Sequence, residues 1–182
     1  MDEKYVSFEK GLDWPIYDSR PIPASAAGGT YELAFFDTAG PTTGLANVKT
    51  ANQFSGSQAF SLRKAIFRWT PIAGAVFTAP QLNVIQDLTN ASYFQLTKNE
   101  VKYWEDSMQG IFAPLSANTT DDIAGLTGAY NFNVPIEFDP SELFEFLVRG
   151  LNPNQIIIAN TISLYIQLMG LRSLEETAVV KG

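Results

Sequence analysis

Ser61 and Lys64 are the first residues whose types and spacing could do chemistry. Serine acyl-enzymes carry a Ser-x-x-Lys motif, with both side chains on one face at the start of a helix. Here the motif falls in a strand-like run, 58–69, where positions three apart point to opposite faces. The companion Ser-Asp-Asn and Lys-Thr-Gly motifs are absent. We therefore interpret both residues as ordinary strand positions.

Four carboxylates lie close together in the sequence, at Glu137, Asp139, Glu142 and Glu145. Glycosidases use such pairs, and Glu137 and Asp139 on one face of a strand would lie about 7 Å apart. These are also the polar positions of amphipathic strands, where solvated acids are expected. We therefore expect a solvated face here and not a glycosidase site.

The chain contains neither histidine nor cysteine. This composition excludes Ser-His-Asp and Cys-His catalysis, disulfides and the usual zinc ligands. Asp121 and Asp122 lie in a polar loop but lack the regular oxygen spacing of a calcium loop. We therefore expect no enzyme activity, no catalytic residue, no metal site and no cofactor.

Acidic residues outnumber basic ones by 19 to 12, which gives a formal net charge of −7. Nucleic-acid-binding domains carry a basic stripe, so this balance argues against them. Arg63, Lys64 and Arg68 form the only basic cluster, close to Phe67 and Trp69. A stacking platform for single-stranded nucleic acid is one interpretation of the cluster. A partner-facing or ion-paired strand is the interpretation we prefer.

The elements that position these residues are clearest in the last third of the chain, 131–171. Within it the apolar side chains share one parity: Ile156, Ile158, Ile162, Leu164, Ile166 and Leu168. The other parity is uncharged and polar: Thr161, Ser163, Tyr165 and Gln167. A period of two predicts a half-buried β-strand. The uncharged outer side suits a protein-covered face better than a free surface.

Similar alternation predicts other strands, and the pattern is less regular in 74–78 and in 111–115. The expected strands are 31–37, 58–69, 74–78, 91–96, 111–115, 134–139 and 144–149. In 58–69 the apolar parity changes, which predicts a bulge near Lys64 or burial on both faces. Residues 81–89 fit a strand and a helix equally well.

One short helix is expected over 98–109. Thr97 and Glu100 have the spacing of a capping box, in which each side chain satisfies a free backbone donor of the other. Val101 and Trp104 follow at helical spacing.

The length of 182 residues predicts a single domain with flanking segments. We expect an extended, aromatic-bearing N-terminal arm over 1–30, a β-sandwich over 31–171 and a C-terminal tail over 172–182. No strand–helix alternation is seen, so the class is all-β, a sandwich or barrel of antiparallel strands.

The arm, the short helix and the closing series NVPIEFD, ELFEFLVR and QIIIANTISLYIQLMG resemble a known family. They are similar to single jelly-roll capsid proteins of tailless icosahedral phages, including phages with an internal membrane, over about 31–171. The resemblance implies a single jelly-roll sandwich of about eight antiparallel strands and no catalytic residues.

It also implies a structural virion protein, assembled in the host cytoplasm as a major, minor or vertex subunit of an icosahedral capsid. The expected partners are copies of the chain itself and other capsid proteins. The arm over 1–30 is net acidic, so we expect no direct binding of nucleic acid. A membrane or another protein would then separate the shell from the genome, and the chain would lie near an internal membrane without spanning it.

Subunit contacts are expected from the arm, from exposed aromatics and from the outer face of the last strand. The candidate interface residues are Trp14, Ile16, Tyr17, Trp69, Thr161, Ser163, Tyr165 and Gln167. The alternative function is a carbohydrate- or ligand-binding β-sandwich module, in which Trp69 or Trp104 would stack on sugars.

Overall fold

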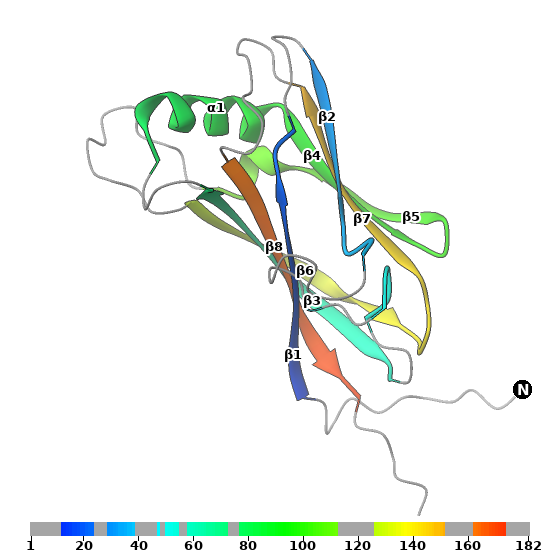
Figure 1. Cartoon of the computed structure of the whole chain (residues 1–182). Helices are drawn as coiled ribbons and strands as arrows, with labels where there is room; N and C mark the ends of the chain where they lie inside the picture. The colour runs from blue at the N-terminus through cyan, green and yellow to red at the C-terminus, as the bar shows by residue number, and fades with distance from the viewer. Residues whose placement is uncertain are drawn as a thin grey trace, which may run out of the picture.

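The computed structural model describes residues 12–23, 29–38, 47, 50–54, 58–72, 77–112, 126–151 and 162–173. Within them the chain forms eight strands, one α-helix and one turn of 3-10 helix (Figure 1). In chain order these are β1 (Leu12–Pro21), β2 (Thr30–Phe35), β3 (Phe60–Pro71), α1 (Ala79–Asn90), β4 (Ser92–Lys98), β5 (Val101–Ser107), η1 (Met108–Gly110), β6 (Leu126–Phe138), β7 (Phe144–Leu151) and β8 (Ile162–Arg172).

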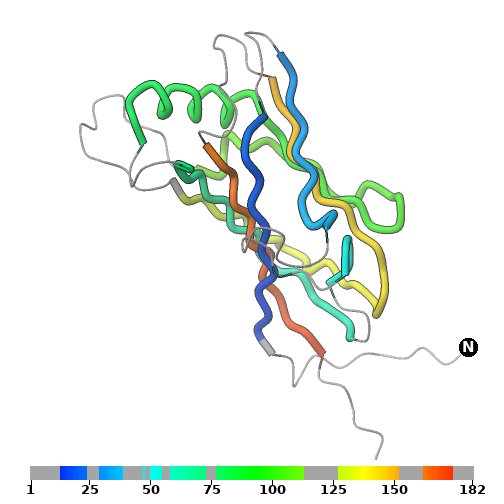
Figure 2. Tube along the Cα trace, in the orientation of Figure 1, coloured from blue at the N-terminus to red at the C-terminus, as the bar shows by residue number. Residues whose placement is uncertain are grey.

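The strands form two antiparallel sheets of four. One has the order β1-β8-β3-β6 and is called the β8 sheet here; the other has the order β2-β7-β4-β5 and is called the β7 sheet. The antiparallel pairs include β1 with β8, β2 with β7, β3 with β6 and β4 with β5. Figure 2 shows the first and last strands, blue and orange, side by side.

The same strand pairing results when one long antiparallel hairpin folds over so that its strands are divided between two sheets. Every pair of consecutive strands except β4 and β5 changes sheet. Eight antiparallel strands in two such sheets make a jelly roll. The expected all-β single jelly-roll sandwich is therefore confirmed.

Alternating apolar positions from both sheets meet in an aromatic core. The rings of Phe67 on β3 and Phe94 on β4 have centroids 5.1 Å apart, which joins the two layers. Phe94 also stacks on Phe146 of the neighbouring strand β7 at 5.9 Å. Trp69 is fully buried near them. Burial of a large aromatic side chain contributes about 2–3 kcal/mol, so these contacts hold the sheets together.

The bulge expected near Lys64 is present. Leu62 lies opposite Ile136, whereas Lys64 lies opposite Asn131, so the register of β3 on β6 shifts between these positions. The shift lets Leu62 face the core before it and Ala65 after it, although the two differ in parity. A bulge of this kind leaves the extra residue outside the ladder.

The helix expected over 98–109 is wrong: β4, a two-residue turn and β5 form a hairpin there. Lys98 pairs with Val101, and the turn residues Asn99 and Glu100 have φ of 47° and 66°. Two positive φ values mark the turn type whose twist matches a hairpin. The hairpin therefore overrode the capping-box spacing, which does not distinguish a helix start from a tight turn.

The helix of the described chain is α1, which covers residues 81–89, the run that fitted a strand and a helix equally well. Its first turn contains Pro80, and the backbone N–H of Thr78 donates to the side-chain oxygen of Gln81 at 2.9 Å. Its side chains Ile85 and Leu88 are buried, and the helix lies at one end of the sandwich (Figure 1). Of the expected strands 74–78 and 111–115, residues 77–78 and 111–112 are not strands, and 74–76 and 113–115 lie outside the described residues.

The described part of the expected arm is a strand of the sandwich, since β1 pairs with β8 along its whole length. Asp18 on β1 is 2% exposed and accepts the backbone N–H of Phe36 at 2.8 Å and that of Ser19 at 2.7 Å. Arg20 adds an ion pair at 2.9 Å. Because Phe36 follows β2, this buried carboxylate ties β1 to the other sheet.

The sheet also takes in the start of the expected tail. Arg172 ends β8, and Ser173 exchanges hydrogen bonds with Ala59: its backbone N–H donates to the Ala59 carbonyl at 3.0 Å, and its hydroxyl accepts the Ala59 N–H at 3.0 Å. Residues 174–182 lie outside the described residues.

Candidate functional site

The outer face of the β8 sheet lies on the opposite side from the core. Strand alternation places Ile162, Leu164, Ile166 and Leu168 inward, where each is 0–2% exposed. The residues between them point outward. The register then sets Tyr165 beside Arg68 of β3, and Arg68 beside Thr127 of β6.

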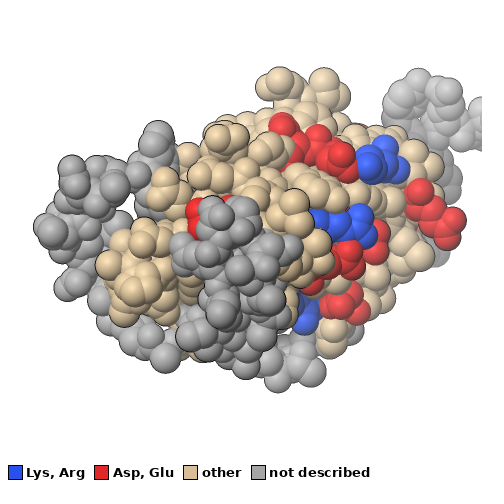
Figure 3. Space-filling model, turned by 90° about the horizontal axis from the view of Figure 1, so that it is seen from above, with Lys and Arg blue, Asp and Glu red and all other residues tan. Residues whose placement is uncertain are grey.

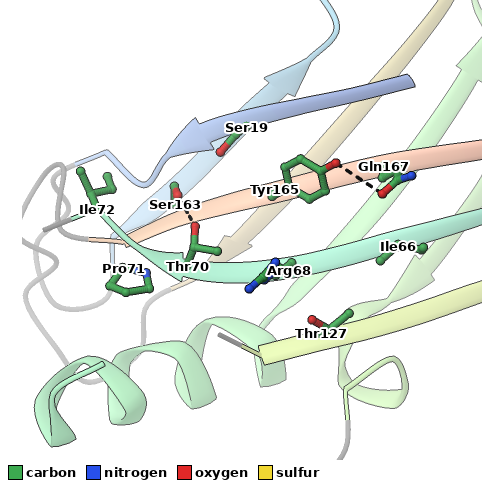
Figure 4. Close-up of a pocket in the computed structure, with 10 residues that line it drawn as sticks. All are labelled: Ser19, Ile66, Arg68, Thr70, Pro71, Ile72, Thr127, Ser163, Tyr165 and Gln167. Carbon is green, nitrogen blue, oxygen red and sulfur yellow. Dashed lines mark hydrogen bonds between the residues drawn. The ribbon is translucent and has the colours of Figure 1, made fainter. Parts of the chain in front are cut away.

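This face contains a hollow of about 530 Å³ (Figure 4). All four strands of the sheet contribute to it, together with Ile72, which follows β3. Its lining residues are Ser19, Ile66, Arg68, Thr70, Pro71, Ile72, Thr127, Ser163, Tyr165 and Gln167. The hollow is thus built of hydroxyl, amide and apolar groups with one charged side chain, Arg68.

Contacts among the lining residues hold its walls. The hydroxyls of Thr70 and Ser163 hydrogen-bond at 2.7 Å, and the Tyr165 hydroxyl donates to the side-chain oxygen of Gln167 at 3.3 Å. The ring of Tyr17 stacks on that of Tyr165, with centroids 5.9 Å apart and planes 27° apart. One face of the Tyr165 ring is therefore already covered from within the chain.

The Tyr165 hydroxyl is neutral at physiological pH. Burial raises its pKa above 10, and the neighbouring Tyr17 raises it further, while the charge of Arg68 acts in the opposite direction. The hollow thus offers a neutral hydroxyl and a cationic guanidinium side by side.

Arg68 has no ion pair within the described part of the chain. Four other cations do: Arg20 with Asp18 and Asp37, Lys98 with Glu142, Lys102 with Glu105, and Arg149 with Glu32. Figure 3, seen from above, shows red and blue atoms next to one another on one part of the surface. Arg68 is exposed on β3, and a guanidinium carries five N–H donors.

Three of the sequence-predicted interface residues, Ser163, Tyr165 and Gln167, line the hollow together. Tyr17 lies against Tyr165, and Thr161 lies outside the described residues. Ser163, Tyr165 and Gln167 share the outer face of β8, the face on which the alternation of the last strand had placed them.

The other three predicted residues lie elsewhere. Trp14 is 36% exposed, and the guanidinium of Arg172 lies 4.7 Å from its ring centroid. Ile16 and Trp69 are 2% and 0% exposed and belong to the core. Neither presents a surface, so their prediction as contact residues is corrected to core packing: strand alternation turns both inward.

The alternative function, a carbohydrate-binding module, relies on Trp69 or Trp104 to stack on sugars, and both rings pack against other parts of the chain. Trp69 is buried, and the half-buried ring of Trp104 has Tyr130 and Phe132 at centroid distances of 5.0 and 5.5 Å. Neither tryptophan lines the hollow.

The interface prediction omitted the other seven lining residues: Ser19, Ile66, Arg68, Thr70, Pro71, Ile72 and Thr127. Sequence reasoning did place Arg68 on a partner-facing or ion-paired strand, and its parity opposite Phe67 and Trp69 was the available signal. What the sequence lacked was the register that sets β3 beside β8.

The motifs considered for catalysis lie apart from the hollow. Ser61 is 1% exposed and its hydroxyl donates to Glu137 at 2.7 Å. Glu142 pairs with Lys98 at 2.8 Å. Burial raises the pKa of Glu142, but hydrogen bonds from Lys98 and the Asp139 backbone lower it more, so the net shift is downward. These acids act as structural partners.

Among the described residues there is no group of three or more side chains that could hold a metal ion. No helix in that part of the chain has the length and hydropathy of a bilayer span.

No protein-family model matches the chain, and no curated protein matches it. Among solved structures, the dimeric latent PorU from Porphyromonas gingivalis is similar over 92% of this chain, at 11% identity and a TM-score of 0.28. The chain spans 14% of the length of that PorU chain. A TM-score this low supports no conclusion about fold or function, so the fold assignment rests on the strand pairing.

Proposed function

We propose that this chain is a structural subunit of a viral capsid that assembles with copies of itself or with other capsid proteins into an icosahedral shell. The jelly roll supports the proposal because capsid proteins use that architecture repeatedly. Lectin domains and cupins use it too, and a fold alone does not decide a function. The surface of the sandwich therefore carries the argument.

The outer face of the β8 sheet is the observation that carries it. A solvent-facing sheet surface is usually rich in charged side chains. Here the lining of the hollow holds hydroxyls, an amide, aliphatic groups and the single charge of Arg68, on a chain of net charge −7. Ser163 is only 8% exposed and Tyr165 and Gln167 are half-buried. Such a face is suited to burial against a protein partner.

The charge of the chain bears on what lies next to the shell. A net charge of −7 repels the phosphate backbone. A capsid built from this subunit would therefore need a membrane or a second, basic protein between it and the genome. The virion, after assembly in the host cytoplasm, is the proposed location.

The proposal is tested by the assembly state of the full chain. We expect native mass spectrometry and electron microscopy, from micromolar to millimolar concentration, to show closed rings or shells. A chain that stays monomeric over the whole range contradicts the proposal. If such a monomer also binds to a glycan array, the carbohydrate-binding alternative takes its place.

A further inference from the structure

Arg68 can bind an anionic partner, and none of the ion pairs among the described residues involves it. It lies between Tyr165 and Thr127 in the sheet, exposed and without an ion pair among the described residues (Figure 4). The aliphatic side chains of Ile66 and Ile72 line the same hollow. A guanidinium binds a carboxylate through two parallel hydrogen bonds, and more strongly where the surroundings exclude water. The hollow therefore fits an acidic side chain flanked by apolar ones.

The hairpin of β4 and β5 carries that combination. Six of the seven residues of β5 are exposed, among them Val101 at 60% and Tyr103 at 54%. Glu100 at the turn is exposed and has no ion pair among the described residues, whereas Glu105 is paired with Lys102. Figure 1 shows the hairpin projecting from one side of the sandwich.

A single chain cannot bring these two features together. The hairpin belongs to the β7 sheet, and the hollow lies on the outer face of the β8 sheet, with the core between the layers. A second copy of the chain can bring its hairpin to the hollow, and contacts between copies are what the proposed capsid function requires. A two-fold contact centred on the hollow would set Arg68 against its own copy, and like charges at an interface are unfavourable. The contact is therefore head-to-tail, a type that generates rings.

We propose that the hollow on the β8 sheet receives the tip of the β4–β5 hairpin of a second copy, with Glu100 of that copy paired to Arg68. Val101 and Tyr103 of the entering hairpin cover Ile66 and Ile72. This inference rests on the proposed capsid function and names the contact that joins its subunits. The opposite charges and the shared apolar surface are its basis.

A charge exchange tests the contact. Arg68→Glu alone and Glu100→Arg alone are each expected to weaken assembly of the full chain by about tenfold or more, because each sets like charges together. The double variant, and an equimolar mixture of the two single variants, are expected to assemble again, since every new contact then joins opposite charges. Native mass spectrometry across a concentration series measures each apparent dissociation constant.

Arg63→Glu is the matched control. It makes the same change in charge at an exposed position of the same strand, at the bulge itself and outside the hollow. We expect it to assemble like the unaltered chain. Circular dichroism and thermal melting identify any variant that has failed to fold, and the exposed positions of Arg68 and Glu100 favour retention of the fold.

Two results overturn the inference and separate it from the proposed function. If the unaltered chain assembles and Arg68→Glu or Glu100→Arg changes nothing, the hairpin contact is wrong while the capsid function stands. Failure of both the double variant and the mixture to assemble, with the fold retained, also refutes the pairing. If the unaltered chain is monomeric throughout, the inference and the proposed function fail together.

Discussion

At the scale of single residues, Tyr31 links three elements inside the fold. It is 4% exposed on β2, its hydroxyl is hydrogen-bonded to that of Ser92 on β4, and Ser92 donates to the carbonyl of Leu88 in α1. Burial raises the pKa of Tyr31 to about 12, although the hydrogen bond with Ser92 lowers it in part. Because this phenol is buried, the free energy of unfolding depends on pH in the alkaline range.

The direction follows from comparing the folded and unfolded chain. The unfolded phenol loses its proton near pH 10, and the folded one near pH 12. The contribution of Tyr31 is therefore fully present below pH 10 and is lost as the pH rises from 10 to 12. The loss amounts to about 2–3 kcal/mol, from roughly 1.4 kcal/mol per pKa unit.

Urea unfolding of the unaltered chain and of Tyr31→Phe at several pH values between 9 and 12 checks this. The Phe variant is expected to lose less stability than the unaltered chain over that interval. Tyr103→Phe, at an exposed tyrosine, is the control and should follow the unaltered chain. Equal losses in Tyr31→Phe and the unaltered chain would contradict the assignment.

At the scale of elements, the β4–β5 hairpin depends on a turn in which Asn99 and Glu100 both have positive φ. The backbone N–H of Asn99 donates to the Leu143 carbonyl at 3.0 Å, and its side chain donates to Glu142 at 2.8 Å. Asn tolerates this conformation well, whereas Glu does not. The strain is thus concentrated at Glu100.

Glu100→Gly is expected to stabilise the folded chain by about 1 kcal/mol, because Asn-Gly is the favoured pair for this turn and glycine has no Cβ penalty at positive φ. Chemical denaturation at a concentration too low for assembly measures the free energy of unfolding. The same substitution within β5, Glu105→Gly, should instead destabilise the chain by about 0.5–1 kcal/mol. A stability loss in Glu100→Gly would argue against the turn.

The hairpin also shows where sequence reasoning failed. The spacing of Thr97 and Glu100 is shared by helix starts and tight turns, so local pattern favoured a helix that pairing with β7 did not allow. For 81–89 the apolar residues satisfied both periods, and the helix formed as α1 only in its tertiary setting. In β8 the pattern fitted a strand alone, because Ile162, Leu164, Ile166 and Leu168 share one parity, and the strand is present over Ile162–Arg172.

The residues of the candidate site also divide into those that a local pattern predicts and those that only strand pairing brings together. Ser163, Tyr165 and Gln167 were predictable because they share one face of one strand. Their grouping with Arg68 and Thr127 depends on pairing between strands far apart in sequence. The parity change in 58–69 indicated the bulge near Lys64, but the register between β3, β6 and β8 is set by long-range contacts that a single sequence does not specify.

At the scale of the whole molecule, the rolled-up pairing joins the two ends of the described chain. Leu12 lies opposite Arg172, while Leu96 lies opposite Trp104 in the local hairpin. Contacts between residues distant in sequence form late, since the entropy of closing long loops must first be overcome. We therefore expect β4 and β5 to pair before β1 joins β8.

Refolding kinetics check this order. Ile16→Ala in β1 and Leu96→Ala in β4 remove side chains that are 2% and 0% exposed, and each should destabilise the fold by about 2–5 kcal/mol. Ile16→Ala is expected mainly to speed unfolding, whereas Leu96→Ala is expected mainly to slow folding. Stopped-flow measurements in urea separate the two rates. The reverse pattern would place the strand of the chain ends in the folding nucleus.

The pairing of Leu12 with Arg172 gives the subunit a polarity. The chain enters β1 and leaves β8 at one pole of the sandwich, while α1 lies toward the opposite pole (Figure 1). In a layer of subunits held in one orientation, every entry and exit point would face the same side. The two surfaces of such a layer would then differ chemically, and a peptide or fluorescent domain joined directly to Leu12 or to Ser173 would label a single surface.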